Sequence, residues 1–272
     1  MLDLVLIDLL LGALVGVVLA LSGAGGGILA VPALVFGAGL DTAHAAPIAL
    51  AAVGMSAATG AFLGLRAGIV RYRAALATAA CGALLAPLGA LVAHRLGNRA
   101  LTVVFALILA WVAVRMLRQA SGRRAADATA PCPSPAPPCC CDPSTGRLVW
   151  SARCTRALLA TGAAAGLCAG MLGVGGGFVL VPALRRTTDL AMESVVATSL
   201  AVIALVACAS IAANAAAGTL DWRVALPFAA GSVAGMLGGR LLARRSDGKL
   251  QQRCFGWVAL GVALALAVKA LR

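Results

Sequence analysis

The chain has 272 residues, of which 62% are hydrophobic and 11% are charged, and its mean hydropathy is +1.00. Soluble globular domains carry about 25% charged residues, so this composition excludes that class and indicates a polytopic membrane protein. The net charge of +13 does not indicate nucleic-acid binding, because the basic residues lie between hydrophobic blocks, where they set the membrane topology.

Hydrophobic blocks follow one another along most of the chain. A bilayer core about 30 Å thick needs roughly 20 apolar residues for each helix that crosses it. The segments expected to be helical are, in chain order, 4–22 with 26–40, 44–65, 74–94, 100–114, 157–172 with 174–184, 194–216, 224–239 and 254–268. We therefore predict an all-α polytopic membrane protein.

Two glycine runs that each lead into a proline are the most unusual feature of the sequence. Residues 23–34 read GAGGGILAVPAL and residues 173–184 read GVGGGFVLVPAL, at an offset of 150. Further glycines match at the same offset, Gly12 with Gly162 among them. Glycine and proline both disfavour a continuous helix, and paired breaks in two halves of a membrane protein point to a transport site.

The repeat divides the chain into two homologous halves, residues 1–119 and 154–272. A polar linker rich in Pro, Ser and Cys joins them over residues 120–153. The segment Gly175–Leu184 gives only about 15 Å of helix, which cannot span a bilayer alone. We therefore expect each half to hold a Gly-broken short helical hairpin plus three transmembrane helices, with the two hairpin tips meeting near the membrane midplane.

The positions of Lys and Arg favour halves of opposite orientation. If each hairpin returns to its starting side, the second half is inverted, and 17 of the 22 basic residues lie inside when the N-terminus is outside. If each Gly-broken segment crosses once instead, the halves are parallel, and 13 basic residues lie inside when the N-terminus is inside. Because basic loops prefer the cytoplasmic side, inverted repeats with a cytoplasmic linker are favoured.

The glycine runs suggest a site for anions. A helix that begins at such a run has unpaired backbone N–H groups at its first turn, and the missing side chains let a ligand touch them. The expected substrate-binding residues are these glycines and nearby polar side chains: Gly25, Gly26, Gly27, Gly175, Gly176, Gly177, Ser22, Ser56, Thr198, Ser199 and Asn214. The alternative is that the glycines only allow close helix packing, while the hydroxyls bond to their own helices.

Two ionisable residues follow the second arms of the hairpins, His44 in the first half and Glu193 in the second. They are candidates for gating or proton relay. The alternative is that both sit in solvated loop ends at helix N-termini. The spans contain no acid and base pair, nucleophile elbow or phosphate-binding loop, so we expect no catalytic residues, no enzyme activity and no cofactor.

The linker is unusually rich in cysteine. In a reducing cytoplasm, clustered thiols are expected to bind metal or undergo redox reactions rather than form disulfides. The candidates are Cys132, Cys139, Cys140 and Cys141. They support a second hypothesis, in which the chain is a membrane-anchored thiol or metal sensor, or a protein that handles soft metals, and acts through the linker.

The paired G-x-G-G-G-x-x-x-V-P-x-L motifs resemble those of the TauE/SafE sulfite exporter family. The Val195–Leu200 run and the similar loops at 67–73 and 217–223 extend the resemblance over nearly the whole chain except the linker. It implies a multi-pass transporter of the bacterial inner membrane for sulfite, sulfonates or related small organic anions. The implied partners are a small anionic substrate and the lipid bilayer. Assembly of several copies of the chain into a homo-oligomer is a further option.

The two halves differ in one part of this resemblance. The second half reads Ala197-Thr198-Ser199-Leu200, whereas the first half reads Pro47-Ile48-Ala49-Leu50 at the same offset. The hydroxyls are therefore not expected to play a symmetric role.

Overall fold

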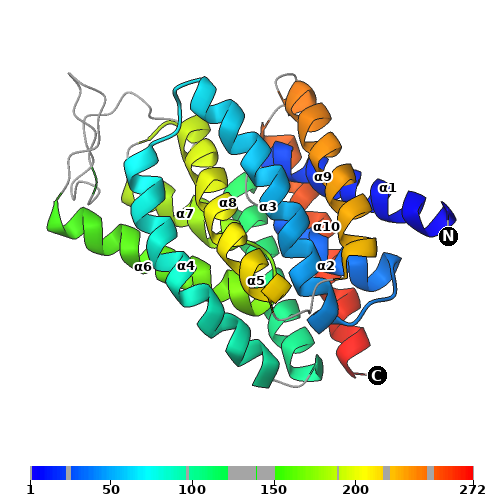
Figure 1. Ribbon diagram of the computed structural model, residues 1–272. Helices are drawn as coiled ribbons and strands as arrows, with labels where there is room; N and C mark the ends of the chain where they lie inside the picture. Colours follow the sequence, from blue (N-terminus) through cyan, green and yellow to red (C-terminus); the bar gives the residue numbers. More distant parts are fainter. Residues whose placement is uncertain are drawn as a thin grey trace.

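The computed structural model describes residues 2–22, 26–95, 98–121, 139, 151–188, 190–216, 221–243 and 248–271. Every regular element in these ranges is an α-helix (Figure 1), which confirms the predicted all-α class. The helices are α1 (Leu2–Ser22), α2 (Gly26–Gly37), α3 (Thr42–Arg66), α4 (Tyr72–Arg95), α5 (Asn98–Ser121), α6 (Ala152–Leu172), α7 (Gly177–Thr187), α8 (Met192–Ala216), α9 (Trp222–Ala243) and α10 (Gly248–Leu271).

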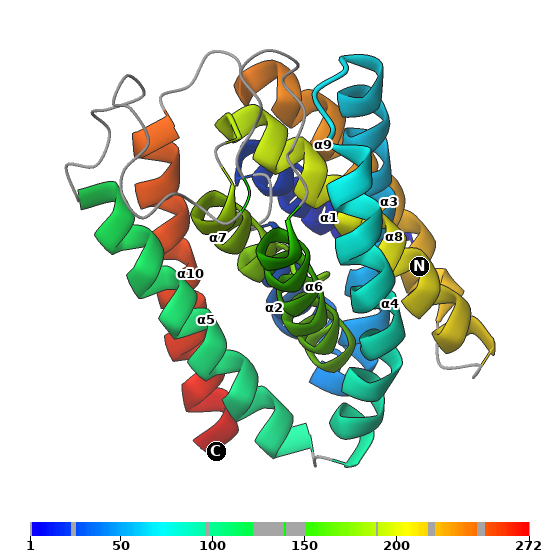
Figure 2. The ribbon, with the colours of Figure 1, turned by 90° about the vertical axis from the view of Figure 1, so that its left-hand side faces the viewer.

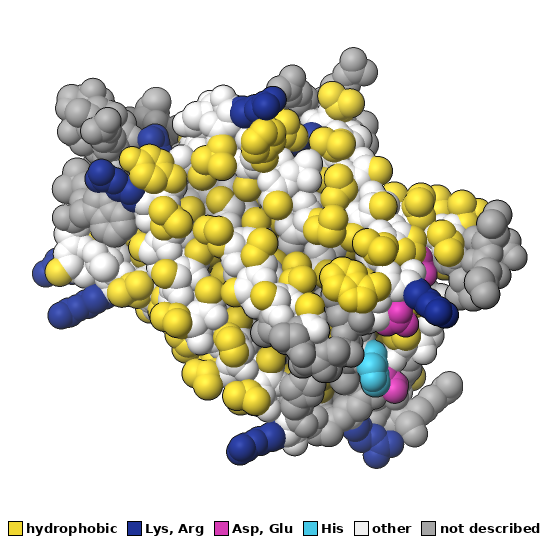
Figure 3. Space-filling model, viewed as in Figure 1, with side chains coloured by type: hydrophobic (Ala, Val, Ile, Leu, Met, Phe, Trp, Pro, Cys, Tyr) yellow, Lys and Arg dark blue, Asp and Glu magenta, His cyan; other side chains and the backbone are white. Residues whose placement is uncertain are grey.

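Helices suited to a membrane make up most of the fold. Five helices of the described residues, α3, α4, α6, α8 and α9, are long and apolar enough to cross a bilayer. Large apolar side chains are exposed on the outside, including Leu84, Leu107, Leu241 and Trp257. Figure 3 shows hydrophobic side chains spread over one whole face, with Lys and Arg mostly at its edges. Such a surface fits lipid, as expected for a multi-pass membrane protein.

The centre of the fold is the antiparallel pair α3 and α8. Gly54 of α3 lies against Ala207 of α8, and Gly64 of α3 lies against Ala197 of α8. Residue numbers therefore increase along α3 in the direction in which they decrease along α8, so the two helices are antiparallel. The missing side chains of these glycines let the two backbones approach closely, as small residues do in membrane proteins. The outer helices α4 and α9 pack against this central pair.

Two outer helix pairs show the same contacts at the repeat offset. Helix α1 packs in parallel on α9, and α6 packs in parallel on α4, with glycines of α1 and α6 against the partner backbone: Gly12 on Phe228, Gly16 on Ser232, Gly162 on Thr78 and Gly166 on Gly82. Adding 150 to the α1 residue and subtracting 150 from the α9 residue converts each contact of the first pair into one of the second. The glycine matches in the sequence therefore mark equivalent helix contacts.

Equivalent helices of the two halves run in opposite directions. This holds for α3 and α8, and also for α5 and α10, which lie side by side and antiparallel (Figures 1 and 2). A two-fold axis that relates antiparallel helices is perpendicular to them, so it lies in the membrane plane if the helices cross the membrane. These contacts are those that an inverted repeat requires. The inverted topology and the bounds of the two halves stay predictions.

The short second arms lie inside the helical bundle. Helix α2 has 12 residues and α7 has 11, so each is about 16 to 18 Å long, roughly half of a bilayer span. Each packs back on the preceding long helix, α1 or α6, and on the central helix of its own half. The two short helices also contact each other. The fold therefore brings the two Gly-broken segments together.

Candidate functional site

The turn between α6 and α7 depends on its glycines. Gly173, Gly175 and Gly176 have φ angles of 70°, 74° and 66°, in the left-handed region that side chains other than glycine rarely adopt. Gly173 ends α6, and Gly176 immediately precedes α7. The carbonyl of Gly176 accepts hydrogen bonds from the amides of Val179 and Leu180, at 3.0 and 3.1 Å. The sequence GVGGG therefore allows one helix to end and the next to begin within four residues.

The two Gly-broken segments touch at the start of α2. Gly27 lies against the carbonyl of Val174, which belongs to the second run, and its other neighbour is Val53 of α3. Gly26 lies against the backbone of Leu19 in α1. A side chain at either glycine would collide with backbone. Gly25, the remaining predicted residue of the first run, lies outside the described residues.

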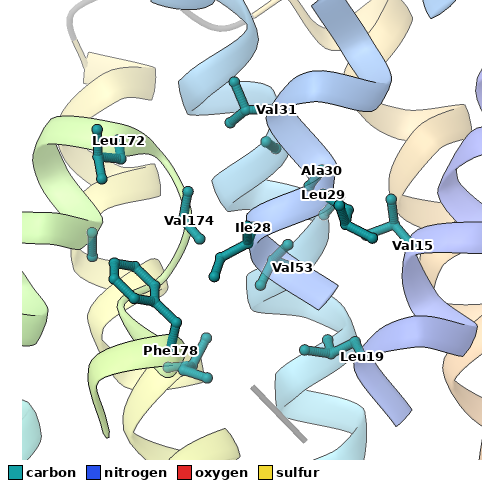
Figure 4. Close-up of a cluster of buried hydrophobic side chains, with 14 of the residues drawn as sticks. Val15, Leu19, Ile28, Leu29, Ala30, Val31, Val53, Leu172, Val174 and Phe178 are labelled. Atoms are coloured by element: carbon teal, nitrogen blue, oxygen red, sulfur yellow. The ribbon is translucent and has the colours of Figure 1, made fainter. Parts of the chain in front are cut away.

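Apolar side chains surround this contact. Figure 4 shows Ile28, Val53, Val174 and Phe178 around the place where the two segments meet. All four are buried, and Ile203 of α8 also lies against the second glycine run. In this state the glycines provide close packing, as the alternative interpretation of the sequence proposed. A ligand can reach their amides only when these side chains separate, so direct binding by the glycines stays a prediction.

Ser56, a predicted binding residue, forms a buried polar contact between α3 and α9. Its hydroxyl lies 2.6 Å from the hydroxyl of Ser232 and donates to the carbonyl of Ala52 at 2.9 Å. Ser56 and Ser232 are both fully buried. The sequence does not single out Ser232, because its only signal is a hydroxyl among small residues in an apolar block.

Thr198 and Ser199 lie in the first half of α8. Thr198 is fully buried, and its Oγ1 accepts a hydrogen bond from the backbone amide of Arg71 at 3.2 Å. Ser199 donates to the carbonyl of Val196 at 2.8 Å. Ile203, which contacts the second glycine run, is five residues further along α8, or about 7.5 Å along the axis. The structure therefore does not place Thr198 at the second run.

Two arginines that are absent from the predicted site bond to the central helices, the Arg71 amide to Thr198 of α8 and the Arg240 side chain to Gly60 of α3. The Arg240 guanidinium donates from Nη1 to the carbonyl of Gly60 in α3, at 3.1 Å. The Nε atom of Arg71 is buried and has no partner among the described residues. Both side chains are half-buried. In the sequence these residues appear as ordinary basic residues at block ends, and only the contacts of Arg240 with α3 and of Arg71 with α8 distinguish them.

The remaining predicted polar residues either lie at the ends of the central helices or have side chains that the structure does not describe. His44 and Glu193 are exposed in the first turns of α3 and α8, which lie at opposite ends of the antiparallel pair. Their exposure agrees with the alternative that both lie in solvated helix N-termini. A gating role for either one stays a prediction. Ser22 and Asn214 belong to α1 and α8, and their side chains are not among those described.

A carboxyl group in α1 is another feature that the sequence does not single out. Asp8 is 4% exposed, and its Oδ1 has no partner among the described residues. The position at the repeat offset is Leu158 of α6, which is buried in an apolar cluster. Asp8 escapes notice because it is a single residue in an otherwise apolar segment.

The structure corrects the prediction for one linker cysteine. Cys139 forms a disulfide with Cys154 at the start of α6, and its amide donates to the carbonyl of Thr187 at 2.9 Å. A disulfide sulfur is not the thiolate that a metal site needs. The described residues contain no group of three potential metal ligands. The other candidates, Cys132, Cys140 and Cys141, lie outside the described residues.

We expect alkylation to detect this disulfide. Both cysteines are fully buried, so the protein is unfolded in every sample before labelling. Without reductant, Cys139 and Cys154 should then resist a maleimide, and both should react after reduction. In unfolded Cys154→Ser, Cys139 should react without reduction, because its partner is gone. Peptide mass spectrometry of the two cysteines measures this. Equal labelling of wild-type Cys139 with and without reductant would contradict the pairing.

The sequence matches the family described as "Sulfite exporter TauE/SafE" over residues 8–266. Two similar proteins come from Xylella fastidiosa strains 9a5c and Temecula1 / ATCC 700964, and each is named "Probable membrane transporter protein". They are 33% and 31% identical over 257 and 262 residues, which cover 93% of this chain and 91% of each relative. No solved structure shows a significant match.

Proposed function

Because the chain belongs to the TauE/SafE sulfite exporter family of membrane transporters, we propose that it is a secondary transporter that exports small anions across the inner membrane. The proposed substrates are sulfite, sulfonates and related sulfur-containing or organic anions. The fold supports this because it is a multi-pass helical bundle whose helices are broken at its centre.

The observation that carries the proposal is the contact between the two Gly-broken segments. Gly27 of the first half lies on the Val174 carbonyl of the second, between the central helices α3 and α8. Transporters built from inverted repeats place their substrate sites near the midplane, at the interface between repeats, where discontinuous helices end. A movement of one half against the other would open this contact to either side in turn.

Energetics indicate what such a site must supply. A bare charge at the bilayer centre costs about 2.5 to 3.5 kcal/mol on insertion scales and more than about 10 kcal/mol in simulations. A helix N-terminus contributes about 0.3 to 1 kcal/mol, and each hydrogen bond to a charged group about 1.5 to 3 kcal/mol. Two helix ends alone do not offset the higher cost, so buried hydroxyls or cationic side chains must assist.

Export needs no coupled ion. With the cell interior negative, an anion that leaves the cell gains about 2.3 kcal/mol for each charge at 100 mV. The membrane potential can therefore drive the proposed export by itself. This requires only a path that is selective for anions and that opens to one side at a time.

Uptake into inside-out vesicles tests the proposal. Vesicles that contain the protein should take up radiolabelled sulfite, thiosulfate or a small alkyl sulfonate faster than vesicles without it, and an interior-positive potential should increase the rate. Radiolabelled glycerol, which is neutral, should enter both kinds of vesicle equally. If none of the three anions enters faster in the presence of the protein, the proposed function is wrong.

A further inference from the structure

We infer that Arg240 and Arg71, together with the Thr198 hydroxyl, form the oxyanion-binding end of the transport path, and that this site occurs at only one end of the α3–α8 pair. The inference rests on the proposed anion transport and identifies the residues that would recognise the charge. None of the predicted glycine contacts supplies a positive side chain, whereas this group supplies two.

The helix contacts place both arginines at one level of the bundle. Gly60 and Gly64 of α3 lie against Leu200 and Ala197 of α8, and Thr198 lies between these two α8 residues along the helix. Arg240 reaches this level from α9, through its hydrogen bond to the Gly60 carbonyl. Arg71 reaches it from the connection between α3 and α4, where its backbone N–H donates a hydrogen bond to the Thr198 hydroxyl.

This level also lies beside the first Gly-broken segment. Gly239, the residue before Arg240, lies against Val17 and Ala20 near the end of α1. Gly26, at the start of α2, lies against Leu19 in the same turn of α1. The Arg240 backbone is therefore close to the point where the first hairpin begins, so an anion bound there would be next to the moving parts.

The two guanidinium groups retain unused hydrogen-bonding capacity. A guanidinium has five N–H donors, and within the described part of the chain Arg240 uses one of them, on Gly60. The buried Nε of Arg71 has no partner there, and neither arginine forms an ion pair with a described acidic residue. Arg240 lies in the last turn of α9 and Arg71 in the connection between α3 and α4, so both are at the end of the bundle, where a transported anion would enter or leave the path. A transported oxyanion would supply the missing partner.

The other end of the central pair lacks this chemistry. At the repeat offset, Arg240 corresponds to Ala90 and Thr198 to Ile48. Arg71 corresponds to Asp221, an exposed carboxylate that accepts a hydrogen bond from the amide of Arg223. The helix scaffold thus shows two-fold related contacts, whereas the charged and hydroxyl groups do not. At these three pairs of positions, one end carries two arginines and a hydroxyl group, and the other end carries none of them.

The chemistry fits a small oxyanion. Parallel N–H groups of a guanidinium match two oxygens of a sulfite or a sulfonate head group, and such charge-assisted bonds are about twice as strong as neutral ones. A threonine hydroxyl can rotate to donate a further hydrogen bond. Lysine would keep the charge but lose the paired geometry.

Transport kinetics in proteoliposomes test the inference, with sulfite as the probe. Arg240→Gln and Arg71→Gln should each raise KM for sulfite roughly 10- to 100-fold, the effect expected when hydrogen bonds to a charge are lost. Arg240→Lys should fall between the wild type and Arg240→Gln. The matched control is Arg223→Gln, which removes an exposed arginine from the first turn of the same helix and should leave KM unchanged.

A thermal measurement separates binding from folding. Sulfite should raise the melting temperature of detergent-solubilised wild type, Arg223→Gln and Arg240→Lys, but not of Arg240→Gln. Unchanged KM and unchanged sulfite stabilisation in both Arg240→Gln and Arg71→Gln would overturn the inference while leaving the proposed function intact. If Arg240→Gln does not fold, the KM for sulfite and the sulfite-induced shift in melting temperature are compared for Arg240→Lys and Arg71→Gln instead. Absence of sulfite flux in the wild type would instead contradict the proposed function.

Discussion

Replacing Gly176 with valine is expected to reduce anion flux to background while the protein still inserts into the membrane. Gly176 has a φ of 66°, and a Cβ added there would collide with the backbone of Ala165 in α6. A β-branched residue in the left-handed region costs about 1 to 3 kcal/mol in strain alone. The start of α7 must therefore move away from α6, which separates the two Gly-broken segments. Gly26→Val should act similarly, because its Cβ would meet the backbone of Leu19.

The measurement is sulfite flux in vesicles, divided by the amount of protein in the membrane. Gly238→Val is the matched control, since Gly238 lies in α9 and a Cβ added there meets nothing within 4 Å. The control should keep wild-type flux. Normal flux in both Gly176→Val and Gly26→Val would show that transport does not depend on the geometry of the glycine runs.

Replacing Gly16 or Gly166 with leucine is expected to destabilise the folded protein strongly and by similar amounts. A side chain at Gly16 would collide with the carbonyl of Ser232 in α9, and one at Gly166 would collide with the carbonyl of Gly82 in α4. Overpacking costs about 1 to 3 kcal/mol and can cost more where backbone must move. The two changes should act alike because the contacts correspond at the repeat offset.

Thermal unfolding in detergent measures this prediction. Gly261→Leu is the control, because Gly261 of α10 has open space around its Cβ position. Its melting temperature should stay close to that of the wild type. If Gly16→Leu lowers the melting temperature strongly and Gly166→Leu leaves it unchanged, the two helix pairs do not contribute equally to stability.

Much of the fold is readable from local patterns in the sequence. Apolar blocks mark the helices, and the bounds agree within a few residues for several of them, such as 44–65 against Thr42–Arg66 and 194–216 against Met192–Ala216. The two glycine runs mark the breaks, because residues other than glycine rarely adopt the backbone angles found at Gly175 and Gly176. These features depend on residues within one or two helical turns, so sequence alone reveals them.

The contacts of the candidate site could not be predicted from the sequence, because the residues that form them lie far apart in the chain. Ser56 meets Ser232 across 176 residues, and Arg240 reaches Gly60 across 180. A basic residue at the end of an apolar block reads as a topology signal, whatever its side chain later contacts. Cys139 likewise reads as one of several clustered thiols until the fold brings it to Cys154.

The sequence by itself determined that this is an all-helical membrane protein of the TauE/SafE family with two paired breaks, because composition, periodicity and the duplicated motif are local properties. Only the tertiary structure decided which helices touch, that the two breaks meet, that Arg240 bonds to Gly60 and that the Arg71 amide bonds to Thr198. The physical reason is that an apolar helix in lipid can turn any of several faces toward its neighbours at similar free energy. Close packing between the backbones then selects the face that turns inward.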